Sequence, residues 1–161
     1  MKIAILMGRG IEGCGVTRYA IETQKWYHKN NMVCDIYASL DKKWPRRQLQ
    51  QNNIIEFTNS EIQALSKKLN SEYDVIFYQS LPAKKGHSED YQNQFLDYLV
   101  KDIEKPIKIA FQNDHKLQSL TRNANIWETM RYMDAAFTFS KETAFAKKMA
   151  IEAPKIPLYQ L

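Results

Sequence analysis

The chain has 161 residues, 44% hydrophobic and 12% aromatic, which suffices for one globular domain with a packed core and excludes an intrinsically disordered chain. Its 23 basic and 18 acidic residues give a net charge of +5, and its two cysteines, Cys14 and Cys34, exclude a disulfide framework. No run reaches the roughly 20 apolar residues of a membrane helix, and the apolar stretch at 3–7 is too short for a signal peptide. We therefore expect a cytoplasmic protein without a membrane partner.

The first predicted elements are a short strand, a glycine-rich loop and a helix. Residues 2–6 are mainly apolar, four glycines follow between Gly8 and Gly15, and a helical pattern runs from Val16 to Lys29. Glycine lets backbone amides approach a bound group closely and tolerates positive φ. The N-terminus of the helix favours an anion at the same place. This order of elements therefore predicts a binding site for a phosphate or a sugar-phosphate group.

Strand and helix patterns alternate along the rest of the chain. Runs rich in β-branched and aromatic residues predict strands at 2–6, 33–37, 54–57, 75–78, 108–111 and 135–139. Helical periodicity predicts helices at 16–29, 61–69, 91–102, 126–132 and 141–150. Ser60 and Ser140 are the expected N-caps of the second and the last helix. The apolar stripe of the first helix is predicted at Val16, Tyr19, Ala20, Thr23, Trp26 and Tyr27.

This alternation predicts the fold class. Strands joined by helices form right-handed crossovers, which give an α/β fold with a doubly wound, mostly parallel sheet and helices on both faces. We expect residues 1–153 to form this domain, and residues 154–161, which include two prolines, to form a linker or an edge segment. In such a sheet the carboxyl ends of the strands share one edge, and ligands bind there.

The loops that follow the predicted strands carry most of the net charge. Segments 7–16, 39–52, 79–91 and 112–125 contain nine basic and five acidic residues, so the rest of the chain is nearly neutral. The basic residues are Arg9, Lys42, Lys43, Arg46, Arg47, Lys84, Lys85, Lys116 and Arg122, and Trp44 lies within their densest cluster. Such an edge is typical of a protein that binds a polyanion such as nucleic acid. The alternative is that exposed loops carry lysines without any ligand.

Residues 8–13 match the dinucleotide-binding fingerprint Gly-x-Gly-x-x-Gly, which is weak evidence when it stands alone. In that fingerprint the helix begins at about the third glycine, whereas here Cys14 and Gly15 lengthen the loop. The acidic residue expected at the end of the second strand is also missing, because Asp35 lies inside the predicted strand and Tyr37 ends it. An NAD(P)-binding enzyme is therefore the weaker alternative.

A polar quartet, Gln112-Asn113-Asp114-His115, follows the apolar run at 107–111. At the carboxyl end of a strand, opposite a glycine loop, these residue types suit hydrogen bonding and proton transfer. Asp114 could accept a proton or fix a hydroxyl group, and His115 could orient it. The alternative is helix capping, for which Asn or Asp serves as well. The local sequence leaves both interpretations open.

Other reactive residue types give weaker signals. Cys14 lies near a helix N-terminus, where a thiol can become reactive. It has no base beside it in the sequence, so a small residue packed among glycines is the simpler interpretation. The three histidines and two cysteines lack metal-ligand spacing, so no metal site is expected. His28 is expected on a solvated helix face.

Three stretches carry a resemblance to a known family: MGRGIEGCGVTRYA, the QNDH quartet and LTRNANIWETMRYMDAAFTFS. Over nearly the whole chain they resemble the N-terminal half of the DNA α-glucosyltransferases of T-even-type phages. Those enzymes have the two-domain GT-B fold and transfer a sugar, with retention, from a UDP-sugar to 5-hydroxymethylcytosine in duplex DNA. The resemblance implies a Rossmann-like domain that holds the DNA acceptor, with a UDP-sugar as co-substrate and no tightly bound cofactor.

The resemblance also implies roles for single residues. Asp114 matches the acidic residue at the acceptor hydroxyl and His115 a histidine beside it, so these two are the expected catalytic residues. The family pattern is His-Asp-His, and Asn113, which replaces the first histidine, cannot carry a proton or a positive charge. The basic residues named above, with Trp44, would contact DNA whose target base leaves the stack. The residues that would face the donor are Gly13, Cys14, Gly15, Val16 and Thr17.

Relative to the family, we expect this chain to be without the donor-binding C-terminal domain. Catalysis requires donor and acceptor to be positioned together. We therefore expect little or no sugar transfer by the chain alone. Three explanations stay open: a split enzyme whose donor domain is on a second chain, an isolated acceptor domain, or a remnant with a new binding role. The alternative is a non-catalytic protein-interaction module that uses the exposed interdomain face.

Overall fold

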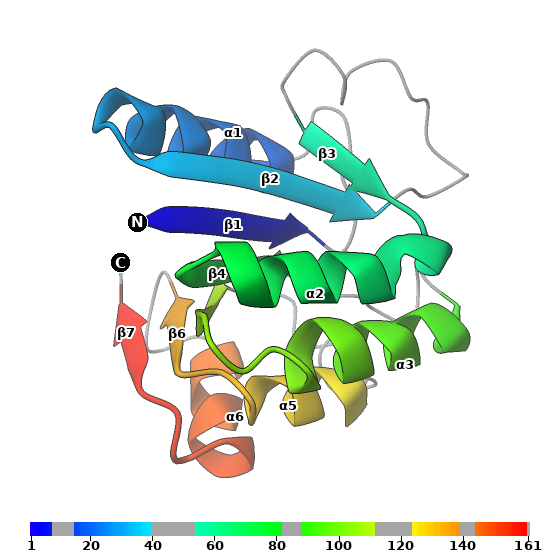
Figure 1. Cartoon of the computed structure of the whole chain (residues 1–161). Helices are drawn as coiled ribbons and strands as arrows, with labels where there is room; N and C mark the ends of the chain where they lie inside the picture. Colours follow the sequence, from blue (N-terminus) through cyan, green and yellow to red (C-terminus); the bar gives the residue numbers. More distant parts are fainter. Residues whose placement is uncertain (8–14, 40–53, 82–87, 112–123, 139–143, 161) are drawn as a thin grey trace.

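A single sheet of seven strands organises the residues that the structure describes (Figure 1). The structure is a computed structural model, and it describes residues 1–7, 15–39, 54–81, 88–111, 124–138 and 144–160. The strands are β1 (Lys2–Met7), β2 (Val33–Ser39), β3 (Ile54–Phe57), β4 (Val75–Ser80), β5 (Ile107–Phe111), β6 (Ala135–Thr138) and β7 (Leu158–Gln160). Their order across the sheet is β3-β2-β1-β4-β5-β6-β7, and every neighbouring pair is parallel.

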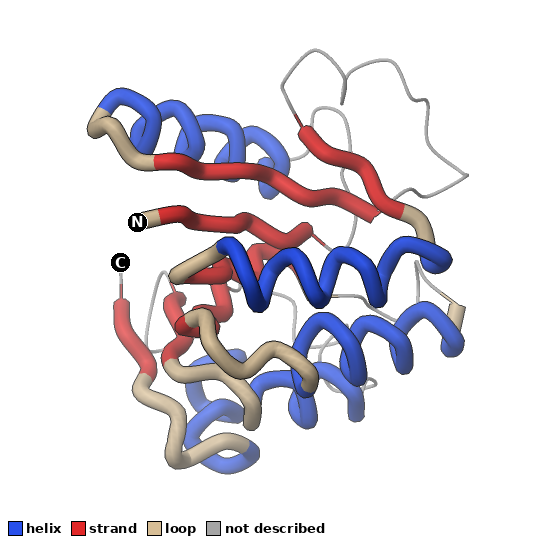
Figure 2. The backbone as a smooth tube through the Cα atoms, viewed as in Figure 1, coloured by secondary structure: helices blue, strands red, loops and turns tan. Residues whose placement is uncertain are grey.

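The helices lie on both faces of this sheet (Figures 1 and 2). They are α1 (Gly15–Lys29), α2 (Ile62–Glu72), α3 (Glu89–Leu96), α5 (Ala124–Met130) and α6 (Ala144–Glu152). One hydrophobic cluster joins α1 to β1, β2 and β3, and a larger one joins α2, α3, α5 and α6 to the other face. The prediction of an α/β, doubly wound, parallel fold is therefore confirmed. Among the described residues, no helix is long and apolar enough to cross a membrane.

The predicted strands are present, with ends that differ by up to two residues. The third strand has the predicted bounds, whereas β2 continues past residue 37 to Ser39 because Ala38 and Ser39 still pair with β3. The C-terminal stretch contains β7, which lies at the edge of the sheet beside β6.

The second predicted helix begins differently from the expectation. Thr58, and not Ser60, precedes the helical region, because Ser60 lies inside a 3₁₀ turn at Asn59–Glu61 that leads into α2. The Glu61 carboxylate accepts hydrogen bonds from the backbone N–H and the hydroxyl of Thr58, both at 2.7 Å. These bonds lower the pKa of Glu61. For α3 the cap is Ser88, whose hydroxyl oxygen accepts from the Tyr91 N–H at 3.2 Å. Ser140 lies outside the described residues.

A π-helical turn at Asp97–Lys101 follows α3, where a regular helix was predicted. The buried Tyr78 hydroxyl donates to the Leu99 carbonyl at 2.6 Å, and the Lys108 ammonium group donates to the carbonyls of Val100 and Ile103 at 3.2 and 2.8 Å. Side chains of β4 and β5 thus donate hydrogen bonds to backbone carbonyls in and just after the π-helical turn.

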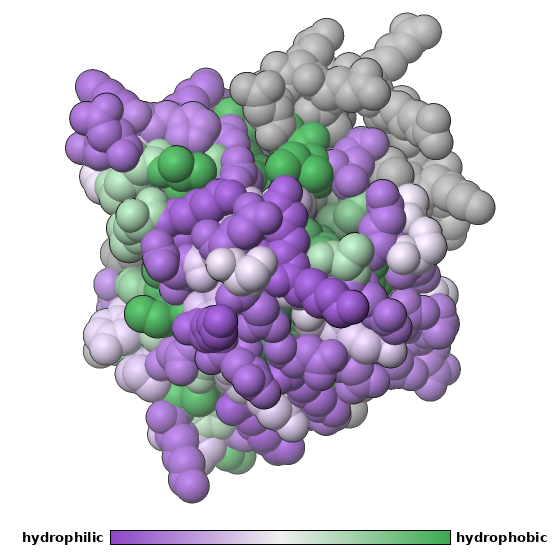
Figure 3. Space-filling view, in the orientation of Figure 1, coloured by the Kyte–Doolittle hydropathy of each residue, from purple (hydrophilic) through white to green (hydrophobic). Residues whose placement is uncertain are grey.

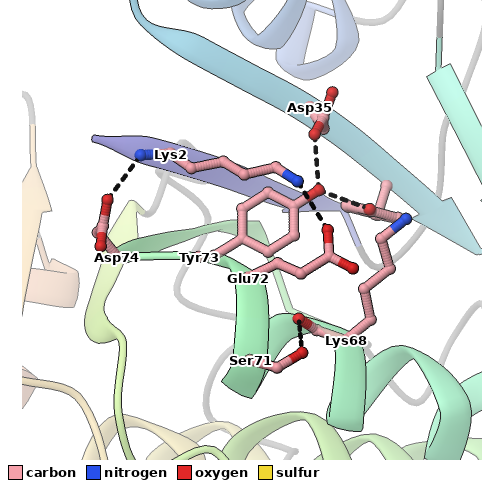
Figure 4. Close-up of polar contacts among 8 residues, drawn as sticks. Lys2, Asp35, Lys68, Ser71, Glu72, Tyr73 and Asp74 are labelled. Atoms are coloured by element: carbon pink, nitrogen blue, oxygen red, sulfur yellow. Dashed lines mark hydrogen bonds and ion pairs between the residues drawn. The ribbon is translucent and has the colours of Figure 1, made fainter.

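Tyr73 is the centre of a hydrogen-bonded cluster between α2 and the sheet (Figure 4). Its hydroxyl donates to Asp35 Oδ2 at 2.6 Å and therefore accepts from the Tyr37 hydroxyl at 2.7 Å. The Lys2 ammonium group lies 4.5 Å from the centre of the Tyr73 ring and pairs with Glu72 at 2.7 Å. Burial, together with the bonds to Asp35 and Tyr37, raises the pKa of Tyr73 above its usual value.

We predict that Tyr73→Phe lowers the free energy of unfolding by about 1–3 kcal/mol, because it leaves the buried Tyr37 hydroxyl and the half-buried Asp35 carboxylate with one hydrogen bond fewer each. Near pH 10 the unfolded chain releases the tyrosine proton, whereas the folded chain retains it. The stability of the unmodified chain should therefore fall as the pH rises above about 10, by up to roughly 1.4 kcal/mol per pH unit for this group. Chemical denaturation at pH 8 and pH 11 measures both effects.

The matched control is Tyr132→Phe, since Tyr132 is 41% exposed. It should leave the stability at pH 8 and the alkaline slope unchanged. Equal slopes for the Tyr73→Phe variant and the unmodified chain would contradict the role given to Tyr73.

Candidate functional site at the carboxyl edge of the sheet

Five segments outside the described residues begin at the same edge of the sheet. Because all strands are parallel, their carboxyl ends share one edge. Segments 8–14, 40–53, 82–87, 112–123 and 139–143 follow β1, β2, β4, β5 and β6 at this edge. Successive strands are added on opposite sides of the β1–β4 pair, so this pair is the topological switch point, at which such folds bind ligands. The candidate site is therefore the carboxyl edge around β1 and β4.

A β-bulge lies at this switch point. Leu6 pairs with Tyr78 and Met7 with Ser80, so Gln79 has no partner residue in β1. The Gln79 side chain is buried, and its Nε2 donates to the Val16 carbonyl oxygen at 2.9 Å. Bulges of this kind redirect a side chain and are common beside active sites. Here the bulge fixes the first turn of α1 against the end of β4.

A second contact joins α1 to the end of β5. The rings of Tyr19 and Phe111 are stacked, with centroids 4.9 Å apart and planes at 18°. Phe111 is the last residue of β5, directly before the Gln112–His115 quartet. Helix α1 therefore contacts both the end of β4, through Gln79, and the last residue of β5, from which the quartet continues.

Gly15 is the first residue of α1, and its surroundings are open. Its φ lies outside the left-handed region, and a Cβ built on it meets no other atom within 4 Å. The described part of the fold therefore does not require glycine at this position. A requirement for glycine here would have to come from a bound group that approaches the backbone closely.

Three of the predicted site residues are described, and they lie together. Gly15, Val16 and Thr17 form the first turn of α1, where Val16 is half-buried and Thr17 is buried. The other predicted residues lie outside the described part of the chain, so their roles remain predictions. They are Gly13, Cys14, Asp114 and His115, and, for DNA, Arg9, Lys42, Lys43, Trp44, Arg46, Arg47, Lys84, Lys85, Lys116 and Arg122.

The structure also bears on the weaker predictions. Asp35 accepts a hydrogen bond from the Tyr73 hydroxyl on the face covered by α2, so it is not placed to bind a dinucleotide ribose at the carboxyl edge.

His28 is exposed, as expected, but its Nε2 lies 2.9 Å from the Cys34 carbonyl oxygen and donates to it. Burial raises the pKa of the Cys34 thiol to about 12, which makes it unreactive near neutral pH. Within the described ranges, no group of three His, Cys, Asp or Glu residues could hold a metal ion.

Two residues of this site, Gln79 and Tyr19, were missed as site residues. Gln79 has a visible signal, because it is a polar residue near the end of the otherwise apolar run VIFYQ. The Tyr19 contact has none, since stacking on Phe111 depends on how α1 crosses the sheet.

Comparison with known proteins defines the family. The profile of the DNA alpha-glucosyltransferase family matches residues 14–156. The chain belongs to the DNA alpha-glucosyltransferase family. The DNA alpha-glucosyltransferase of Enterobacteria phage T4 is 30% identical over 155 residues, which are 94% of this chain but 38% of that protein. The resemblance inferred from the sequence is thereby confirmed.

Solved alpha-glucosyltransferase structures share the fold over the whole chain. One, in complex with UDP and a 13-mer DNA containing an HMU base, has a TM-score of 0.87 at 30% identity, and the match covers 100% of this chain and 42% of that one. Another, in complex with UDP-glucose and DNA containing an abasic site, has a TM-score of 0.83 at 30% identity. This match covers 99% of this chain and 42% of that one. The chain thus spans about two fifths of the length of these glucosyltransferases.

We predict that Gly15→Ala leaves the chain as stable as before or raises its free energy of unfolding by up to about 1 kcal/mol, because alanine is the better helix former and meets no neighbour. Thermal and denaturant unfolding measure this. A loss of more than about 1 kcal/mol would contradict the open surroundings of Gly15.

Proposed function

We propose that this chain is the acceptor-binding domain of a DNA glucosyltransferase, which holds duplex DNA containing 5-hydroxymethylcytosine while a sugar is transferred to it from a UDP-sugar. Membership of the family and the relatives solved with UDP, UDP-glucose and DNA support this proposal. The chain would act on phage DNA in the cytoplasm of the host cell. The chain spans about two fifths of the relatives' length. We further propose that a second chain can supply the donor-binding part of the enzyme.

The observation that carries the proposal is the meeting of the candidate segments at one edge. The N-terminus of α1 at Gly15 follows β1 of the switch-point pair. Parallel α/β sheets bind ligands at this point, and a helix N-terminus favours a phosphate group. The segments that contain the predicted DNA contacts begin at the same edge. An acceptor base and a sugar donor could therefore meet there.

In this proposal Asp114 accepts a hydrogen bond from the hydroxymethyl group of the acceptor base and holds its oxygen toward the anomeric carbon of the donor. His115 orients the carboxylate. Gly13, Cys14, Gly15, Val16 and Thr17 supply backbone amides and a small surface to the donor. The chemistry asked of this chain is thus mainly positioning, which by itself can remove a large part of a reaction barrier.

We predict that the chain binds duplex DNA and that the affinity falls on the order of 100-fold between about 50 and 200 mM salt, as expected for about four phosphate contacts. Replacing Lys84 and Lys85 together by alanine should reduce the slope of log affinity against log salt by about two. Replacing the exposed Lys67 and Lys105 together by alanine makes the same change in net charge and should leave the slope unaltered. Fluorescence anisotropy measures both. Equal effects of the two double variants would contradict the prediction that the basic residues at the carboxyl edge contact DNA.

We predict that sugar transfer requires a second polypeptide. The probe is the part of the T4 phage enzyme outside the stretch that this chain matches, mixed with this chain, UDP-glucose and hydroxymethylated duplex DNA. Mass spectrometry of the DNA should show transfer, and Asp114→Asn should reduce its rate at least 100-fold. The control Asp102→Asn alters an exposed carboxylate away from the site and should have no effect. Transfer by Asp114→Asn at the unmodified rate would remove the proposed role of Asp114.

A further inference from the structure

Gln79 is a buried polar residue among apolar side chains. It is 3% exposed, and Ile5, Phe77 and Phe111 line the same cavity. By contrast, the solvent-facing surface over α2 and α3 is mainly hydrophilic (Figure 3), so this chain follows the usual separation of polar and apolar side chains. Burying an amide costs free energy unless it is hydrogen-bonded. The packing of β4 would accept an apolar residue here, and it therefore does not explain a glutamine.

The Gln79 amide bonds to the backbone of α1. Its Nε2 donates to the Val16 carbonyl oxygen at 2.9 Å, from the bulge at which Met7 pairs with Ser80. In a regular helix that carbonyl also accepts from the N–H four residues later, so the helix does not need a second donor. The bond therefore serves the placement of α1 and not its formation.

This bond fixes the first turn of α1. A peptide unit is planar, so a bond that holds the Val16 carbonyl also holds the plane of the unit that joins Val16 to Thr17. The amides of a first turn point toward the helix N-terminus, where an anionic group binds. The stacking of Tyr19 on Phe111 holds α1 through a side chain, whereas Gln79 holds its backbone. The direction of the first-turn amides thus depends on Gln79.

We propose that Gln79 is a positioning residue for the UDP-sugar donor. It does not touch the donor. It holds the Val16 carbonyl, and thereby the amides of the first turn of α1, where they meet the diphosphate of the donor. Removal of the Gln79 amide leaves the helix intact but lets its first turn move relative to β4, which weakens donor binding. The inference rests on the proposed function, in which Gly15, Val16 and Thr17 face the donor.

Gln24 offers a matched comparison on the same helix. It is 6% exposed, and its Nε2 donates to the Cys34 carbonyl oxygen at 2.9 Å. This bond also joins α1 to the sheet, and its acceptor retains a second donor in His28 Nε2. Gln24 lies about two turns after Val16. The two glutamine bonds are thus alike in burial, length and acceptor, and they differ in their distance from the candidate donor turn.

The test titrates the ¹⁵N-labelled chain with UDP-glucose and follows the amide signals of residues 15–17 by NMR. In the unmodified chain these signals should shift and saturate at millimolar UDP-glucose. Gln79→Leu should weaken binding about fivefold or more, as expected for the loss of one well-placed hydrogen bond. Gln79→Met, which keeps the length of the side chain and removes the amide, should do the same. Gln24→Leu should lower the melting temperature as much as Gln79→Leu does and leave UDP-glucose binding unchanged.

Equal weakening by the Gln79 and Gln24 variants, or unchanged binding by a folded Gln79 variant, overturns the proposal. So does an unmodified chain that binds duplex DNA but shows no shifts with UDP-glucose at residues 15–17, an outcome that leaves the proposed DNA binding intact. A chain that binds UDP-glucose in a Gln79-dependent manner but binds no DNA would refute the acceptor role and support this inference.

Discussion

The parallel direction of all seven strands constrains everything else in this molecule. A parallel sheet sends each crossover helix back to the amino edge, so every loop that follows a strand begins at the carboxyl edge. Glycine-rich, basic and carboxylate-bearing segments that are far apart in the sequence consequently start from one border of the sheet. The same constraint requires apolar strands to be covered on both faces, and the two core clusters lie on opposite faces of the sheet.

The site is organised through α1 more than through any single strand. Gln79 ties the first turn of α1 to β4, and Tyr19 stacks on the last residue of β5.

The sequence predicted the fold class and most strand positions, because strand and helix periodicities are local properties of the chain. It placed Gly15, Val16 and Thr17 at a helix N-terminus for the same reason. It did not predict the bulge at Gln79, which results from the register between two strands distant in the sequence. Periodicity also identified the apolar stripe of α1, but it does not show what covers a stripe: Tyr19 and Trp26 are exposed, whereas Ala20 is buried. The family resemblance depended on short motifs, and the profile match confirmed it.

The central claim, that DNA binds at the carboxyl edge, is tested most directly by photo-cross-linking. Duplex DNA carrying a photoreactive base beside 5-hydroxymethylcytosine is irradiated with this chain, and the modified peptides are identified by mass spectrometry. The account predicts adducts within segments 8–14, 40–53, 82–87 or 112–123, which follow strands at that edge. Adducts confined to the amino edge, at 30–32, 102–106 or 131–134, would contradict it.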